Sequence, residues 1–190
     1  MDPATFENAI RESIATKQRL LDTCLPEIEE FCRRAIKTIA AGGKLLFCGN
    51  GGSSCDAAHA AGELVGWFEK HDRKGYAAIA LGHEIPTVTA VGNDKGFEFI
   101  FARQVHAIGN AQDMLIGIST SGGSKNVVCA IEAAREVGMS VGVLVSSRSG
   151  PMAELADVAI RVPSDNTARI QESHLLCVHM LCAAIEEAMG

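Results

Sequence analysis

Apolar side chains recur at helical spacing through the first forty residues. They stand three, four or seven positions apart, at Phe6, Ile10, Ile14, Leu21, Leu25, Ile28, Phe31, Ala35 and Ile39. Because an α-helix completes a turn in about 3.6 residues, this spacing gathers them on one face. The pattern predicts a long amphipathic helix over 3–41 that ends at Gly42 and Gly43, with Pro26 as a candidate break.

Five short apolar runs separated by helical patterns follow this helix. We predict strands over 44–48, 76–81, 114–119, 140–145 and 158–162, and helices over 97–108, 125–137 and 168–189. Continuous apolar runs are typical of strands covered on both faces, and alternation with helices favours a parallel sheet. We therefore expect a single α/β domain. It would be a Rossmann-like three-layer sandwich with a five-stranded parallel sheet over 42–190 and a helical arm over 1–41.

Composition and charge argue against several classes of protein. The 190 residues are 47% hydrophobic and 21% charged, as in globular domains, and a net charge of −6 with dispersed basic residues argues against nucleic acid as a partner. No apolar run approaches the roughly 18 residues of a membrane span, and residues 1–6 lack a signal pattern. We expect no membrane association and a cytoplasmic location. The seven cysteines contain no CxxC pair and are expected mostly in the core.

The apolar stripe of the first helix is longer than a domain of this size needs to cover. We therefore expect part of that helix to pack against another subunit, in a homo-oligomer. A monomeric mass in sedimentation would contradict this expectation.

Two loops rich in glycine and serine directly follow predicted strands, where parallel sheets bind their ligands. The first, Gly49–Ser54, begins Gly-x-Gly but has Ser54 where a dinucleotide-binding loop has its third glycine, which argues against a nicotinamide enzyme. The second, over 119–124, offers four hydroxyl groups at a helix N-terminus. Capping a helix needs only one hydroxyl, so this loop favours a phosphate monoester. The chain has no Walker-type nucleotide loop.

The helix expected after the first loop carries Asp56, His59 and Glu63. His59 and Glu63 are four positions apart, which places their side chains on the same face of the helix. Such a pair can hold a divalent metal, or it can set a proton donor beside an acceptor. The alternative is a surface pair without function, but its position near the ligand-binding end of the sheet favours a functional role.

The last predicted helix carries Gln171, Glu172, His174 and His179. His179 lies in an apolar stretch, where a histidine is more often a hydrogen-bonded core residue than a catalyst. Gln171 and His179 are separated by about 12 Å along the helix and about 80° around it. They can serve one site only by reaching toward each other or by belonging to different subunits.

Four segments resemble, in this order, the phosphoheptose isomerases of the sugar isomerase (SIS) domain family: GNGGSSCDAAHAAGEL, VGNDKGF, GISTSGGSKNV and ARIQESHLLCVH. The resemblance covers nearly the whole chain. STSG alone would indicate only the wider superfamily, whereas HxxxE together with RIQExH and the later histidine is more specific. The resemblance implies isomerisation of sedoheptulose 7-phosphate to D-glycero-D-manno-heptose 7-phosphate through an enediolate. This is the first step of nucleotide-activated heptose synthesis, which supplies lipopolysaccharide or capsule.

The resemblance also assigns substrate-binding residues. It implies that the sugar contacts Asn50, Gly51, Gly52, Ser53, Asn93, Asp94 and Gln171, and that the phosphate contacts Ser119, Thr120, Ser121 and Ser124. Two positions depart from the pattern of some members and affect secondary contacts. Ser54 stands in place of a histidine, and Ala168 in place of an acidic residue.

The catalytic and metal assignments come from the same motifs. The resemblance implies that Glu63 is the general base and His179 its acid partner, and that His59, Glu63, Gln171 and His179 match positions that bind zinc, one ion per subunit. It further implies a homotetramer with sites at the subunit contacts, which agrees with the expectation from the arm.

Two other functions remain open at this point. A non-catalytic SIS module that binds a replication-initiator protein would have no need of Glu63 together with His179. The other is a phosphosugar isomerase of the superfamily that acts on a pentose or hexose phosphate, and a panel of ketose phosphates assayed by proton exchange at C1 would separate the three functions.

Overall fold

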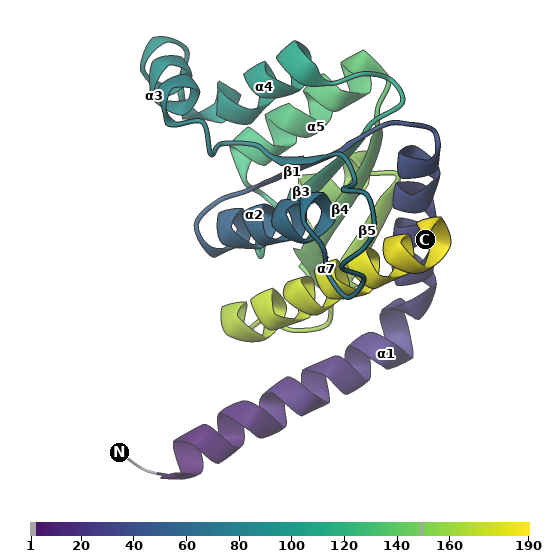
Figure 1. Cartoon of the computed structure of the whole chain (residues 1–190). Helices are drawn as coiled ribbons and strands as arrows, with labels where there is room; N and C mark the ends of the chain where they lie inside the picture. The colour runs from purple at the N-terminus through teal and green to yellow at the C-terminus, as the bar shows by residue number, and fades with distance from the viewer. Residues whose placement is uncertain (1–2, 149) are drawn as a thin grey trace.

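A computed structural model describes residues 3–148 and 150–190 and contains one five-stranded parallel sheet between two layers of helices (Figure 1). The strands are β1 (Leu45–Gly49), β2 (Ala78–Ala80), β3 (Met114–Ile118), β4 (Ser140–Ser146) and β5 (Val158–Val162). They lie in the order β2-β1-β3-β4-β5, and every neighbouring pair is parallel. The three-layer α/β prediction is confirmed.

Alternate residues of β1, β3, β4 and β5 pack into two separate cores. Leu45 and Phe47 face one helical layer, whereas Leu46 and Cys48 face the other, because successive side chains of a strand point to opposite faces. The first layer contains α1 (Pro3–Ala40), α2 (Gly52–Val65) and α7 (Thr167–Met189). The second contains α4 (Ile100–Ile108), α5 (Lys125–Val137) and α6 (Pro151–Leu155). A helix α3 (Ile85–Asp94) and a 3₁₀ turn η1 (Phe97–Phe99) precede α4.

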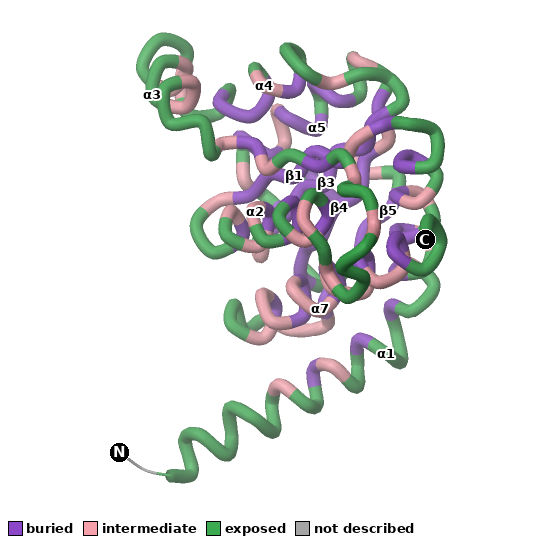
Figure 2. The backbone as a smooth tube through the Cα atoms, viewed as in Figure 1, coloured by how far each residue is buried: buried purple, intermediate pink, exposed green. Residues whose placement is uncertain are grey.

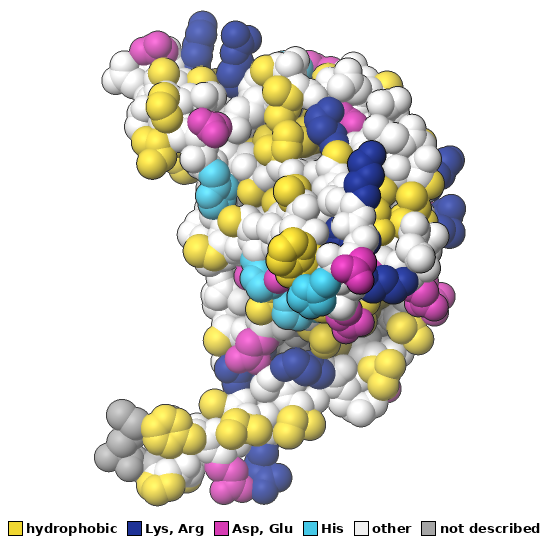
Figure 3. Space-filling model, viewed as in Figure 1, with side chains coloured by type: hydrophobic (Ala, Val, Ile, Leu, Met, Phe, Trp, Pro, Cys, Tyr) yellow, Lys and Arg dark blue, Asp and Glu magenta, His cyan; other side chains and the backbone are white. Residues whose placement is uncertain are grey.

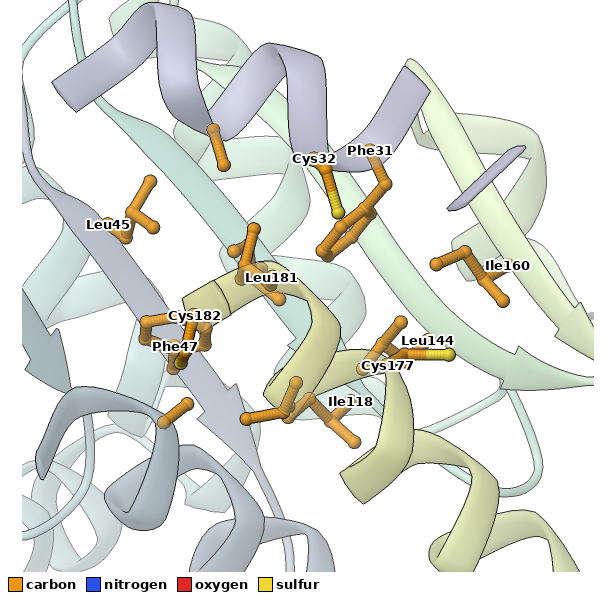
Figure 4. Close-up of a cluster of buried hydrophobic side chains, with 14 of the residues drawn as sticks. Phe31, Cys32, Leu45, Phe47, Ile118, Leu144, Ile160, Cys177, Leu181 and Cys182 are labelled. Carbon is orange, nitrogen blue, oxygen red and sulfur yellow. The ribbon is translucent and has the colours of Figure 1, made fainter. Parts of the chain in front are cut away.

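The first core joins α1 and α7 to the sheet. Figure 4 shows Phe31 of α1 and Leu181 of α7 beside Leu144 of the sheet, and all three are at most 1% exposed. Burial of a side chain of this size contributes about 1.5–3 kcal/mol. Five of the cysteines are buried, Cys129 is half-buried and Cys55 is exposed, and all seven are free. The cysteine prediction is confirmed.

The first helix continues through Pro26 as one element, although the ribbon bends part-way along (Figure 1). A proline inside a helix removes one backbone hydrogen bond, which bends a helix more often than it ends it when packing holds both sides. The second half packs into the core, and the first half projects from the domain with most of its residues exposed (Figure 2). Phe6, Ile10 and Ile14 are 58–63% exposed on this arm.

Two helices were not predicted, and the edge strand is half as long as predicted. Helix α3 has no fully buried residue, and its partly buried Val88 and Val91 form a short apolar stripe, while α6 has only five residues. The run over 76–81 forms only the three-residue edge strand β2, which pairs with β1 alone. None of the helices in the described ranges is both long and apolar enough to span a bilayer.

Candidate active site

The loop after β1 is joined to the start of α5 by a pair of amides. Asn50 Nδ2 donates to Asn126 Oδ1 at 2.8 Å, and Asn126 Nδ2 donates back to Asn50 Oδ1 at 2.8 Å. Gly51 has a φ of +56°, a backbone conformation that glycine adopts without strain. Asn126 is 3% exposed and was not singled out from the sequence. The signal that would have found it is its position in the first turn of the helix that follows the serine loop.

The serine loop after β3 has hydroxyl groups that converge. Ser119 Oγ lies 3.3 Å from Ser121 Oγ and 3.0 Å from Ser124 Oγ, and it accepts the N–H of Gly122 at 3.2 Å. Thr120 follows Ser119 and is half-buried. The Ser124 side chain makes no capping bond to α5, so its hydroxyl is not used as a helix cap. This arrangement suits an anion at the helix N-terminus.

A cavity of about 250 Å³ lies where the two loops meet. It is lined by Asn50, Ser124, Asn126 and Lys125, together with Phe97 and Glu98 of η1. The first loop, the serine loop and the segment before α4 thus share one concave surface at the carboxyl ends of β1 and β3. This is where ligands bind in open parallel sheets.

Helices α2 and α7 lie beside each other and bring two histidines into contact. His59 Nε2 lies 3.1 Å from His179 Nε2 and 3.3 Å from Glu63 Oε1. The ring of Phe68 stacks on the His179 imidazole, with centroids 5.5 Å apart and 28° between the planes. Figure 3 shows histidine side chains grouped on one face of the molecule. The cluster sets a carboxylate and two imidazoles within reach of one proton-transfer site.

Burial shifts the pKa of two further titratable groups near the site, His174 and Asp56. His174 is fully buried, its Nε2 lies 3.2 Å from the Val145 carbonyl oxygen, and burial lowers the pKa of His174 to about 4. His174 is therefore the core histidine of α7, and His179 is the one at the surface cluster. Burial raises the pKa of Asp56, an effect that His59 opposes, and Asp56 Oδ2 has no hydrogen-bond partner among the described residues.

Comparisons with known proteins show the family to which the chain belongs. The family model for the SIS domain matches residues 9–146. A phosphoheptose isomerase of Helicobacter pylori is 45% identical over 185 residues, which cover 95% of this chain and 96% of the relative. The chain belongs to the SIS domain family, among the phosphoheptose isomerases. The solved phosphoheptose isomerase of Francisella tularensis superposes on this SIS chain with a TM-score of 0.93 at 38% identity, covering 98% of this chain and 100% of the other.

A second solved phosphoheptose isomerase, from Neisseria gonorrhoeae, gives a TM-score of 0.91 at 38% identity and covers 97% of this chain and 98% of the other. Both matches include the long first helix and the final helix, because they extend over nearly all of each chain. The fold of this SIS chain is therefore that of the solved phosphoheptose isomerases from end to end.

Some residues expected at the site of the SIS chain lie apart from the histidine cluster. The side-chain amide of Gln171 lies directly over Gly52, where an added Cβ would meet it. Ser53 is 4% exposed in the first turn of α2. Asn93 and Asp94 are exposed at the end of α3, and Asn93 Nδ2 donates to Asp94 Oδ1 at 2.8 Å. No hydrogen bond within the described ranges joins either of them to the two loops.

The two positions that depart from the family pattern have local partners. Ser54 Oγ lies 3.2 Å from His83 Nε2, and His83 was not singled out from the sequence. Ala168 is exposed at the start of α7, and its N–H donates at 3.0 Å to the side chain of Asn166, which caps the helix. Neither position contacts the histidine cluster.

Proposed function

We propose that this chain is a phosphoheptose isomerase that interconverts sedoheptulose 7-phosphate and D-glycero-D-manno-heptose 7-phosphate in the cytoplasm. The observation that carries the proposal is the contact of His179 with His59, which is itself beside Glu63. The relatives named phosphoheptose isomerase match over nearly their whole length, which supports the same activity here. The product would supply heptose for lipopolysaccharide or capsule.

The reaction requires two proton movements, for which the cluster offers two groups. Glu63 removes a proton from C1 of the ketose and returns it to C2, through an enediolate. His179 takes the proton of the O1 hydroxyl and delivers one to O2, so that the carbonyl group moves from C2 to C1. General acid–base catalysis by a positioned group contributes on the order of 10²–10⁴ in rate.

The serine loop supports a remote anchor for the substrate. The Ser119 hydroxyl lies within 3.3 Å of those of Ser121 and Ser124, at the positive end of α5. The 7-phosphate is the part of the substrate farthest from C1 and C2. Binding energy gained there orients the reacting carbons without touching them. Asn50, Gly51, Gly52 and Ser53 then face the sugar hydroxyls, with Asn93, Asp94 and Gln171 as further candidates.

Zinc, one ion per subunit, is a separate part of the proposal. Tetrahedral zinc holds its nitrogen ligands at about 2.0–2.1 Å, so two ligand atoms lie roughly 3.3 Å apart. The spacings of His59 Nε2 to His179 Nε2 and to Glu63 Oε1, 3.1 and 3.3 Å, fit this requirement pairwise. In the described part of the chain no three His, Cys, Asp or Glu side chains are arranged as a metal site, and Gln171 lies at Gly52 instead.

When bound, zinc would supply positive charge that stabilises the two oxygens of the enediolate. The residues proposed to hold it are His59, Glu63 and His179, which fit a zinc ion in pairs and not as a set of three in this structure, with Gln171 as the remaining candidate. Ligation would compete with the acid–base roles of Glu63 and His179. Metal analysis of the purified protein, with rates before and after chelation, tests this part. No bound zinc and an unchanged rate would remove it.

We also propose a homotetramer with sites at subunit contacts. The arm presents an apolar stripe with Phe6, Ile10 and Ile14 more than half exposed, which a second subunit would cover. Polar contacts such as that of Ser13 Oγ with Glu172 Oε2, at 2.7 Å, join the arm to α7 but leave Phe6, Ile10 and Ile14 uncovered, which supports contact between arms or between an arm and a neighbouring domain.

A substrate panel tests the function against its rivals. The chain is incubated in D₂O with sedoheptulose 7-phosphate and with pentose and hexose ketose phosphates, and deuterium at C1 is measured by NMR. We expect exchange to be fastest with the heptose phosphate. Faster exchange with a shorter sugar would favour another phosphosugar isomerase, and no exchange with any sugar would favour a non-catalytic module that binds a replication-initiator protein.

A further inference from the structure

The segment over 66–77, between α2 and β2, carries Trp67, Phe68 and Tyr76, and the ring of Phe68 reaches the histidine cluster. Phe68 stacks on the His179 imidazole. Trp67, the one tryptophan of the chain, lies 5.5 Å from the ring of His71 and is 57% exposed. The segment has no helix or strand, so something other than a regular hydrogen-bond ladder must fix the position of Phe68.

A buried carboxylate holds this segment. Glu186 is 2% exposed, and its oxygens accept the backbone N–H groups of Phe68 at 2.9 Å, Glu69 at 2.9 Å and Lys70 at 3.0 Å. Glu186 lies seven residues after His179 on α7, so both side chains are on the same face of one helix. The helix that carries His179 therefore also places the ring that packs on it.

Arg73 connects Glu186 to the end of α2. Its Nε donates to Glu186 Oε1 at 2.5 Å, and its side chain is 5% exposed. Its Nη2 donates to the backbone carbonyl oxygen of Glu63 at 2.7 Å, and Nη1 donates to that of Leu64 at 3.0 Å. These carbonyls belong to the last turn of α2, which has no intrahelical donors for them. Arg73 thus fixes the end of the helix that bears Glu63.

We propose that the buried Glu186–Arg73 pair is a positioning element, which sets Glu63 through its backbone and His179 through the ring of Phe68. The inference rests on the proposed acid–base roles of Glu63 and His179. A buried ion pair is seldom more stabilising than apolar residues of the same volume, so stability alone does not explain one. The hydrogen bonds of Glu186 and Arg73 instead connect α7, which carries His179, to the end of α2, which carries Glu63.

The test uses three variants of the full-length chain. Phe68→Leu removes the ring from His179, Phe68→Tyr retains it, and Glu186→Gln removes the charge that holds the segment. Glu187→Gln is the matched control, because Glu187 is the next residue of α7 and is exposed. The readouts are kcat and KM for sedoheptulose 7-phosphate, the ¹H resonance of the His179 ring, assigned with His179→Asn, and the emission maximum of Trp67.

We expect kcat to fall at least tenfold in Phe68→Leu and Glu186→Gln, with KM within twofold of the unchanged chain. The His179 resonance should move in both variants, because it loses the ring-current shift from Phe68, and Trp67 emission should shift in Glu186→Gln. Phe68→Tyr and Glu187→Gln should keep kcat within threefold. If Glu186→Gln does not fold, Phe68→Leu still tests the contact with His179.

Values of kcat within twofold of the unchanged chain in both variants would overturn the proposal. The proposal would also be overturned if kcat and the melting temperature fell and KM rose together while the His179 resonance did not move. That is the result expected of a purely structural role. Failure of the proposed function gives a different result: the unchanged chain itself would not convert the heptose phosphate, whereas the His179 and Trp67 signals would still report whether Glu186 controls Phe68.

Discussion

The Nε2 atoms of His59 and His179 lie 3.1 Å apart, although 120 positions of sequence separate the two residues. At this distance the N–H of one ring can donate a hydrogen bond to the nitrogen of the other, and the tautomers decide which ring is the donor. Glu63 also lies beside His59, at 3.3 Å. A proton that enters this cluster therefore has two imidazoles and one carboxylate among which it can move.

Replacing Glu63 with Gln tests the base directly. The amide keeps the shape of the side chain but cannot take the C1 proton, so we expect turnover to fall by about 10²–10⁴. Circular dichroism and melting temperature should be unchanged, since Glu63 is partly exposed. Conversion of sedoheptulose 7-phosphate is the measurement, with Glu187→Gln as the control. Turnover within threefold of the unchanged chain would show that Glu63 is not the base.

Alanine substitutions in the serine loop should separate binding from folding. Ser121 is exposed, and its Oγ accepts the exposed Gly123 N–H at 3.3 Å and lies 3.3 Å from Ser119 Oγ, so Ser121→Ala should change stability little. It should raise KM by roughly 10–100-fold, the value of one hydrogen bond to a charged group. Ser119 is 5% exposed and accepts the Gly122 N–H, so Ser119→Ala should also lower the unfolding free energy by about 1 kcal/mol. Steady-state kinetics and urea unfolding measure both quantities. Equal KM values in the unchanged chain, Ser121→Ala and Ser119→Ala would exclude this loop as the phosphate site.

Substitution by alanine should be harmful at Gly52 and favourable at Gly62, two glycines of α2. A Cβ at Gly52 would meet the amide of Gln171, so Gly52→Ala should displace Gln171 and weaken substrate binding. A Cβ at Gly62 meets nothing within 4 Å, so Gly62→Ala should stabilise the helix by about 0.5–1 kcal/mol and leave KM unchanged. Melting curves and KM values test the pair. The prediction is wrong if Gly52→Ala binds substrate as well as Gly62→Ala does.

Glu186 should give the fold a characteristic sensitivity to acid. Burial raises the pKa of its carboxyl, but hydrogen bonds from Arg73 and from the N–H groups of Phe68, Glu69 and Lys70 outweigh this and lower the pKa to about 2. Because this value is below the ordinary 4.5, the ionised carboxyl stabilises the fold fully above about pH 4.5. That stabilisation is lost as the pH falls toward 2.

We therefore expect the unfolding free energy of the unchanged chain to fall steeply between about pH 4.5 and 2, and that of Glu186→Gln to be lower at about pH 6 but flatter in this range. Urea unfolding followed by circular dichroism at several pH values is the measurement. His174, whose lowered pKa removes stability between about pH 6.5 and 4, is present in both chains and cancels in the difference. Parallel curves would contradict the prediction.

The apolar stripe of the arm predicts an effect on assembly. A charge on it, in Ile14→Asp, should dissociate the oligomer, because a buried carboxylate without a partner is costly. Ala15→Asp is the control, because Ala15 is exposed and lies one position along, about 100° around the helix from Ile14. Sedimentation should show a mass near 20.0 kDa for Ile14→Asp and a multiple of it for the control. A monomeric mass for the unchanged chain would end the tetramer proposal.

The sequence predicts elements that bury an apolar face and misses those that do not. Strand β5 and helix α5 have the predicted bounds, because both contribute alternating or periodic side chains to a core. Helix α3 has no fully buried residue, and only the partly buried Val88 and Val91 pack against the core, which is too short an apolar stripe to reveal the helix. The sequence marks Pro26 as a candidate break, but the packing of residues on both sides of it keeps α1 continuous.

For the site, local spacing predicts the His59–Glu63 contact, because residues four apart on a helix are neighbours. The contact with His179 depends on α2 and α7 lying side by side, which no local pattern contains. The sequence alone favours a core role for His179, yet the buried histidine is His174. Phe68, Arg73 and Glu186 were missed for the same reason, since their interactions join segments more than a hundred residues apart or lie outside any motif.

The distribution of the thiols makes the chain suitable for labelling without mutation. Burial raises the pKa of Cys32 to about 11 and that of Cys48, Cys177 and Cys182 to about 12, so these groups stay protonated and unreactive at neutral pH. Cys55 is the one exposed thiol in the described ranges, and it stands in the first turn of α2. A maleimide dye or nitroxide would attach there first and would report on ligand entry beside the Asn50 loop.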